Sequence, residues 1–285
     1  MPMPSTHWPA PAKINRFLHV TGRRADGYHE LQTLFQFVEP TDWLDFELTE
    51  GPAIERQGGV LGLAPEADLI VRAAQALKTL ASVPQGVRIT VNKQIPAGGG
   101  LGGGSSDAAT TLVALNALWG CQLAQNDLLA LGARLGADVP VFISGHAAWA
   151  EGIGDQLTPM TPDRPWLLLL NPEETVATEN IFCDAKLTRQ GVHITMCDFE
   201  AELARNDCES VVRERYPKVA QALDRLAEFG PAMLTGTGGC MFARFDNEQT
   251  ARQALAEWDG PGYGWVCQPK NRSPLLERLA AQEHR

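Results

Sequence analysis

Apolar and polar residues alternate in the first fifty residues in a pattern typical of β-strands. Residues 13–20, 31–38 and 42–49 are predicted strands, and the last shows the clearest alternation. A polar loop with a turn at Asp26 and Gly27 separates the first strand from the second. The N-terminal part of the chain therefore contributes several strands to a sheet.

Apolar residues at helical spacing then predict three helices. Residues 68–81 begin with Asp68 as a suitable N-cap and carry an apolar face that extends to Leu80. After a predicted strand at residues 87–92, a longer helical pattern covers residues 106–119, and a third covers about 126–135. Strands and helices thus mix in the first half of the chain.

Three prolines among residues 158–165 mark a predicted domain boundary, giving domains over residues 1–160 and 161–285. The second part contains, in order, a buried strand at 166–170, helical segments that include 217–229, a hairpin at 232–245, a helix at 248–258 and a strand at 264–269. The order β-α-β-β-α-β predicts a ferredoxin-like arrangement.

Composition is that of a globular protein, with 44% hydrophobic and 20% charged residues. The net charge of −10 argues against unspecific nucleic-acid binding, although residues 1–25 contain four cations and no acid. The six cysteines form no CxxC pair and the histidines no HExxH motif, so no metal ligands are predicted. Without a signal-peptide pattern or a membrane-length apolar run, we expect a reduced, cytoplasmic protein with no membrane partner.

A glycine cluster is the strongest chemical signal in the chain. Six of the seven residues 98–104 are glycine, and the cluster joins a predicted strand to a helix that begins at Ser105. Backbone amides at such a junction can approach phosphate oxygens. The cluster satisfies GxGxxG, but no acidic residue follows about 20 positions later, and the GK[ST] of a Walker loop is absent. The residues alone therefore predict a phosphate site and leave its class open.

The segment PAGGGLGGGSSDAA resembles the Pro-x-x-x-Gly-Leu-Gly-Ser-Ser-Ala signature of the galactokinase, homoserine kinase and mevalonate kinase (GHMP) superfamily, with two extra glycines. The form GGGLGGGSS is similar to its 4-diphosphocytidyl-2-C-methyl-D-erythritol kinase family. The segments PAKINRFLHVTGRRADGYHEL, LGADVPVFISGHAAWAEGIG, LTGTGGCMF and NRSPL agree, so the resemblance extends over residues 11–275. It implies an α+β, two-domain GHMP-kinase-like fold with an N-terminal mixed sheet and helices and a ferredoxin-like C-terminal domain.

The resemblance implies an ATP-dependent kinase that phosphorylates the 2-hydroxyl of 4-diphosphocytidyl-2-C-methyl-D-erythritol, on the non-mevalonate route to isoprenoid precursors. ATP is the phosphate donor, and Mg²⁺ arrives with ATP. The residues that the resemblance assigns to ATP binding are Pro96, Ala97, Gly98, Gly99, Gly100, Leu101, Gly102, Gly103, Gly104, Ser105 and Ser106. The family often has Asn where this chain has Asp68, which leaves the recognition of the purine open.

Two residues are candidates for the chemistry. From the residues alone, Asp138 is equally suited to cap the next segment. The resemblance makes Asp138 the base that takes the proton of the substrate hydroxyl. It places Lys13 beside Asp138, where the cation would hold the carboxylate ionised and stabilise the developing alkoxide.

Four further residues are assigned to the substrate, which carries a cytidine diphosphate group. By resemblance, Tyr28 stacks on the cytosine and His29 hydrogen-bonds to its edge. Asn15 lies two residues from Lys13 on the same strand face, and Thr178 is expected to line the cleft from the second domain. Two alternatives stay open: a sister kinase acting on homoserine or mevalonate, and a non-catalytic module that binds nucleotides or nucleic acid. The oligomeric state is left open too.

Overall fold

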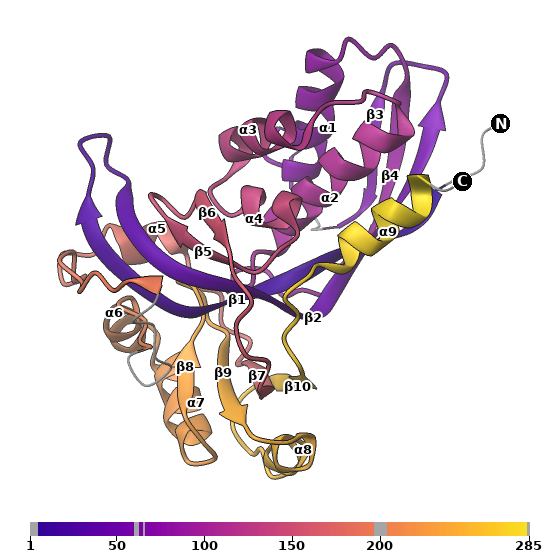
Figure 1. The fold of residues 1–285 in the computed structure, drawn as a ribbon. Coiled ribbons are helices and arrows are strands. Elements are labelled where there is room, and N and C mark those ends of the chain that lie inside the picture. The colour runs from indigo at the N-terminus through magenta and orange to yellow at the C-terminus, as the bar shows by residue number, and fades with distance from the viewer. Residues whose placement is uncertain (1–4, 60–62, 65, 197–203, 284–285) are drawn as a thin grey trace.

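The computed structural model describes residues 5–59, 63–64, 66–196 and 204–283. Two sheets, each covered by helices, adjoin one another where the long strands β1 (Ser5–Arg23) and β2 (His29–Thr49) cross the middle of the molecule (Figure 1). Among the described residues, no helix has the length and apolar character needed to span a membrane.

The first sheet has six strands and is mixed, as predicted. Its other strands are β3 (Ile54–Gly58), β4 (Gly86–Asn92), β5 (Ala148–Glu151) and β6 (Gln156–Pro159). The order is β3-β4-β2-β5-β6, with β1 also paired to β2, and β3 and β4 are the one parallel pair among these strands. The helices that pack with it are α1 (Leu69–Leu80), α2 (Gly103–Leu118), α3 (Gln125–Leu135) and α4 (Val139–Ser144). Their apolar faces and the sheet enclose the largest core of the described residues.

The predicted break between strands 31–38 and 42–49 is wrong, because β2 is continuous across both. Pro40 lies at a bulge: Pro11 of β1 is opposite Thr41, whereas the next residue, Ala12, is opposite Val38. Proline has no N–H to donate, and a bulge leaves its position outside the ladder of hydrogen bonds. The long β1–β2 ribbon can therefore extend from the first sheet to the second.

Two details of the helices differ from the sequence patterns. Asp68 caps α1 as predicted, since its carboxylate accepts from the Ile70 amide at 2.8 Å, but Leu80 is 51% exposed rather than part of the buried face. Helix α2 begins at Gly103, earlier than the expected start at residues 105–106. The reason is Gly102, whose φ of 73° lies in the left-handed region that glycine adopts without strain and lets the chain turn into the helix early.

The second sheet confirms the ferredoxin-like prediction. Its strands are β7 (Trp166–Asn171), β8 (Ala232–Leu234), β9 (Met241–Phe245) and β10 (Tyr263–Cys267), in the antiparallel order β10-β7-β9-β8. The helices of this part are α5 (Thr178–Phe182), α6 (Glu209–Arg215), α7 (Pro217–Ala227) and α8 (Glu248–Ala256). A second core lies between β7, β8 and β9 and the helices α6 and α7.

The last helix, α9 (Pro274–Glu283), was not predicted and returns to the first sheet. It packs against β1 and α2, and Leu275 is buried in the first core. Figure 1 shows this yellow helix beside the indigo start of the chain.

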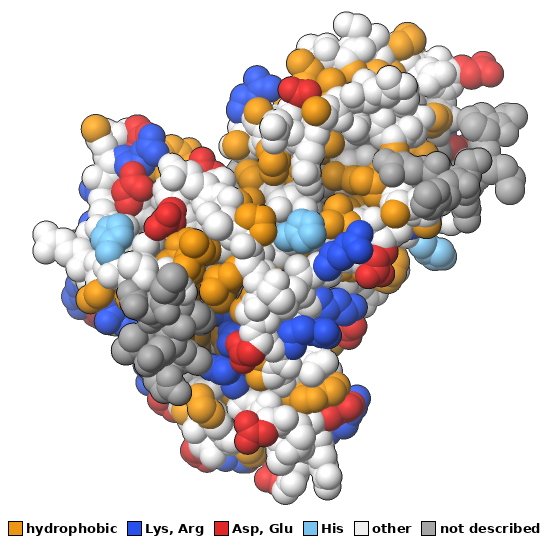
Figure 2. All heavy atoms as spheres, viewed as in Figure 1, with side chains coloured by type: hydrophobic (Ala, Val, Ile, Leu, Met, Phe, Trp, Pro, Cys, Tyr) orange, Lys and Arg blue, Asp and Glu red, His pale blue; other side chains and the backbone are white. Residues whose placement is uncertain are grey.

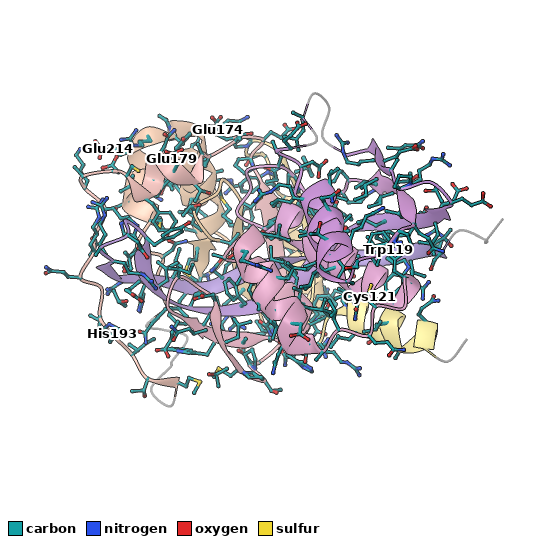
Figure 3. All side chains as sticks on the ribbon, turned by 90° about the horizontal axis from the view of Figure 1, so that it is seen from above. Trp119, Cys121, Glu174, Glu179, His193 and Glu214 are labelled. Atoms are coloured by element: carbon teal, nitrogen blue, oxygen red, sulfur yellow. The ribbon has the colours of Figure 1, made fainter. Side chains whose placement is uncertain are left out.

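The boundary between residues 160 and 161 stays a prediction. Seen from above, Trp119 and Cys121 after α2 lie on the side of the molecule opposite Glu179 of α5 (Figure 3).

Candidate active site

A cavity of about 560 Å³ brings together residues of the first sheet with residues of α5 and of the loop between β8 and β9. Its walls include the glycine loop before α2, the Lys13 and Asn15 positions of β1, the loop that contains Asp138, and Thr178 of the second part. A cavity of this size suits small-molecule ligands. Most of the predicted site residues therefore lie around one space, although they are far apart in the sequence.

The glycine loop has a backbone that side chains would not tolerate. Gly98, Gly100 and Gly102 have φ angles of 71°, 76° and 73°, in the region that favours glycine. The loop leads directly into the first turn of α2, where the backbone amides have no partners within the helix. This junction offers N–H donors and the positive end of a helix dipole to an anion.

A second glycine segment, between β8 and β9, holds this loop in place. The Gly239 amide donates to the Gly98 carbonyl at 3.3 Å, and the Cys240 amide to the Gly99 carbonyl at 3.1 Å. A Cβ atom on Gly238 would lie 2.0 Å from the nitrogen of Gly100. The two backbones therefore touch, and the second sheet fixes the shape of the loop.

Ten of the eleven residues assigned to ATP line the cavity, namely Pro96, Ala97, Gly98, Gly99, Gly100, Leu101, Gly102, Gly103, Gly104 and Ser105. Ser106 is the exception. Its side chain is fully buried, and its hydroxyl donates to the Pro11 carbonyl at 2.7 Å, so the hydroxyl ties α2 to β1. Of the two serines, Ser105 is the one at the cavity.

Lys13 and Asp138 meet at the cavity. The Lys13 ammonium lies 3.3 Å from a carboxylate oxygen of Asp138. It also donates to the Asn15 side chain at 2.7 Å and to the Gly100 carbonyl at 3.1 Å, and it faces the Phe35 ring. The Lys13 side chain is 4% exposed, whereas that of Asp138 is 35% exposed. Asp138 precedes α4 but makes no side-chain capping bond, so the capping role considered from the sequence is wrong.

Asn15 positions Lys13. Its side-chain oxygen accepts from Lys13, and its amide nitrogen donates to the Thr33 hydroxyl at 2.8 Å. The Asn15 backbone amide donates in turn to the Thr235 hydroxyl at 2.9 Å. These bonds orient the amide group, and Asn15 still lines the cavity. The expected placement of Asn15 and Lys13 on one strand face is therefore confirmed.

The two residues assigned to the cytosine lie where the turn after β1 leads into β2. Tyr28 is 59% exposed and His29 is buried, and neither is among the cavity-lining residues. The His29 ring stacks on Phe182, which does line the cavity, with ring centroids 5.1 Å apart. Thr178 also lines it and shares a 2.8 Å hydrogen bond with the Thr237 hydroxyl. Sequence reasoning missed Phe182, although it lies four residues after Thr178 in the same segment.

A buried charge cluster beside the glycine loop was also missed. Lys93 lies 2.7 Å from Asp107 of α2 and forms a second ion pair with Asp42 of β2. Burial raises the pKa of Asp107 to about 7; Lys93 opposes this shift and Asp42 adds to it. One Asp107 oxygen is buried with no partner among the described residues. Asp107 directly follows the two serines, but it shares Lys93 with Asp42, which lies 65 positions away in the sequence.

Asp68, where the family often has Asn, has both carboxylate oxygens engaged. One accepts from the Ile70 amide, and the other pairs with Arg56. Arg56 lies on β3, and Asp68 lines the cavity. The Asp68 carboxylate is thus paired with a neighbouring cation rather than left as an isolated charge at the cavity wall.

The chain is similar to known kinases over nearly its whole length. Residues 68–146 match the family "GHMP kinases N terminal domain", and residues 185–264 match "GHMP kinases C terminal". Proteins named 4-diphosphocytidyl-2-C-methyl-D-erythritol kinase from Shewanella baltica (strain OS195) and Shewanella piezotolerans are each 48% identical, over 97% of this chain and 98% of their own.

Solved structures agree. A crystal structure of 4-(cytidine 5'-diphospho)-2C-methyl-D-erythritol kinase is 32% identical, with a TM-score of 0.80, and the match covers 94% of this chain and 99% of that one. A mevalonate kinase structure with a TM-score of 0.67 is 16% identical over 95% of this chain and 100% of that one, and it shows the shared fold alone.

Proposed function

Because the chain belongs to the 4-diphosphocytidyl-2-C-methyl-D-erythritol kinase family of the GHMP kinases, we propose that it transfers the γ-phosphate of ATP to the 2-hydroxyl of 4-diphosphocytidyl-2-C-methyl-D-erythritol. The observation that supports this proposal most directly is the Lys13–Asp138 pair, 3.3 Å apart, beside a glycine loop suited to phosphate. A base and an anion site at one cavity are what phosphoryl transfer to an alcohol requires.

Asp138 is the proposed base. Its partly exposed carboxylate accepts the proton of the substrate hydroxyl as that oxygen attacks the γ-phosphorus and the bond to the β-phosphate oxygen breaks, releasing ADP. The Lys13 ammonium is held next to Asp138, because it also donates hydrogen bonds to the Asn15 side-chain oxygen and the Gly100 carbonyl. Its fixed charge stabilises negative charge on the attacking oxygen.

The glycine loop is the proposed phosphate cradle, where backbone amides of residues 98–105 donate to phosphate oxygens. Magnesium, when bound with ATP, would neutralise charge on the phosphates. The cavity offers the Ser105 hydroxyl as a hard oxygen atom that suits this ion. In the described part of the chain, no three acidic, histidine or cysteine side chains form a metal site. The proposal that Mg²⁺ arrives on ATP rests on the chemistry of phosphoryl transfer from ATP.

The substrate is proposed to lie between Asn15 and Thr178, with its base toward the Tyr28–His29 turn. Support comes from Phe182, an aromatic wall of the cavity that already stacks on His29. Tyr28, the residue before His29, is 59% exposed and leaves its ring free to stack on a base. A hydroxyl acceptor near Asp138 and an aromatic base site at a distance suit a substrate with a nucleotide at one end.

Phosphorus NMR tests the proposal. The purified protein is incubated with Mg-ATP and 4-diphosphocytidyl-2-C-methyl-D-erythritol, and parallel samples contain homoserine or mevalonate. A new phosphomonoester signal together with ADP is expected in the first sample alone. Signal in a parallel sample would instead identify a sister kinase.

A non-catalytic nucleic-acid module is the weaker alternative. Lys and Arg side chains are interspersed with Asp and Glu on the face seen in Figure 2, and the net charge is −10. Such a surface gives little phosphate attraction. No salt-dependent binding of RNA is expected in a filter-binding assay.

A further inference from the structure

Arg189, between α5 and α6, joins His29 to the segment that carries Phe182. Its Nε atom donates to Nε2 of His29 at 3.1 Å. Its other nitrogens donate to backbone carbonyls, at 3.2 Å for Phe182, 2.6 Å for Asp184 and 3.3 Å for Leu187. All three guanidinium nitrogens are therefore held, and no ion pair of the described residues includes Arg189.

This contact determines which nitrogen of His29 carries the proton. A guanidinium group is always protonated and can only donate, so Nε2 of His29 must accept and cannot carry hydrogen. The single proton of a neutral imidazole then sits on Nδ1, for which the described part of the chain provides no partner. We propose that Arg189 is a positioning residue that holds His29 as the neutral Nδ1–H tautomer, so that the ring presents a fixed hydrogen-bond donor to the substrate base.

The charges around His29 also favour the neutral imidazole. Burial lowers the pKa of His29, and the cations of Arg189 and of Arg23, its pairing partner on β1, lower it further. Phe182, packed on the ring, adds no charge. The imidazole is therefore neutral near pH 7.5, as acceptance from Arg189 requires.

A fixed donor has a consequence for specificity, which rests on the function proposed above. Cytosine offers acceptors at O2 and N3, whereas uracil carries a hydrogen on N3. A donor at Nδ1 facing N3 matches cytosine and leaves two donors opposed with uracil. A binding site that recognises its ligand through a hydrogen bond rejects an analogue that cannot make this bond. Arg189, which never needs to touch the base, would thus favour cytidine over uridine substrates.

Two Arg189 variants and a matched control test this. Arg189→Met removes all donors but keeps the stem, and Arg189→Lys keeps a donor-only group. Arg215→Met is the matched control, since Arg215 pairs with Asp184 of the same segment without contacting His29. Nitrogen-15 NMR of histidine-labelled free protein reports the His29 tautomer. Calorimetry with CDP and UDP, at saturating non-hydrolysable ATP analogue, reports base preference.

We expect Nδ1–H in the wild type, in Arg215→Met and in Arg189→Lys, and Nε2–H in Arg189→Met. The CDP-to-UDP affinity ratio should fall about tenfold in Arg189→Met alone, as expected for one hydrogen bond. In turnover, KM for the cytidine substrate should rise while kcat changes less than about twofold. Protonated or Nε2–H His29 in the wild type, or an unchanged tautomer or CDP-to-UDP ratio in folded Arg189→Met, would overturn the proposal. Wild-type protein that binds CDP but phosphorylates no methylerythritol substrate would refute the proposed function instead.

Discussion

Replacing Asp107 with Asn tests whether the buried cluster beside the glycine loop carries an unbalanced charge. Asp107 is 3% exposed, and the one ammonium of Lys93 pairs with both Asp107 and Asp42. Burial, with Asp42 adding to it and Lys93 opposing it, raises the pKa of Asp107 from 3.8 to about 7. In the folded protein this group therefore holds its proton at pH 5 and loses it by pH 8.

The sign of the effect follows from proton counting. In the unfolded chain the carboxyl is ionised at both pH values, so the folded state binds more protons between about pH 4 and pH 7. The free energy of unfolding then falls as the pH rises through this window. With pKa values of 3.8 and about 7, the loss between pH 5 and pH 8 is about 2–3 kcal/mol. An Asn side chain does not titrate and avoids this loss.

Urea unfolding of wild type and Asp107→Asn, followed by tryptophan fluorescence at pH 5, 6, 7 and 8, measures the difference. The free energy of unfolding of the variant, relative to that of the wild type, should rise by about 2–3 kcal/mol between pH 5 and pH 8. Asp259→Asn is the control: a hydrogen bond from Arg225 lowers the pKa of Asp259, so that group is ionised in both states throughout. A stability difference for Asp107→Asn that stays constant over this pH range would refute the reasoning.

Three further predictions concern the cavity and the thiols. Asp138→Ala should lower kcat by at least about 10²-fold with ATP affinity unchanged by calorimetry, because the proposed base is lost and the glycine loop is intact; near-normal turnover would remove the base assignment. Gly238→Ala should weaken ATP binding, because its Cβ would lie 2.0 Å from the loop backbone; Gly51→Ala, where no atom lies within 4 Å of the added Cβ and which does not line the cavity, is the control, and equal ATP affinities in the two variants would count against this. Iodoacetamide at pH 7.5, read by mass spectrometry, should label exposed Cys183 and spare Cys240, since burial raises the pKa of the Cys240 thiol to about 12; rapid labelling of Cys240 in folded protein would contradict its burial.

The sequence by itself determined the features that depend on residues close together in the chain. Alternation and helical spacing located the elements of the ferredoxin-like part, and Asp68 was identified as a cap because a cap acts over two residues. The glycine cluster indicated the junction of a loop with a helix start, since glycine-permitted backbone and unpaired amides are local properties, and its role as an anion site stays a prediction. The family motifs then indicated Lys13 and Asp138 as a pair.

Only the tertiary structure decided contacts between distant residues. No local pattern shows that Ser106 turns to β1 while Ser105 faces the cavity, or that Arg189 reaches His29 across 160 positions. The continuity of β2 through Pro40 likewise depended on a bulge set by its partner strand. Such contacts result from how the two sheets pack, and packing fixes hydrogen-bond partners, burial and pKa together, which the order of residues along the chain does not specify.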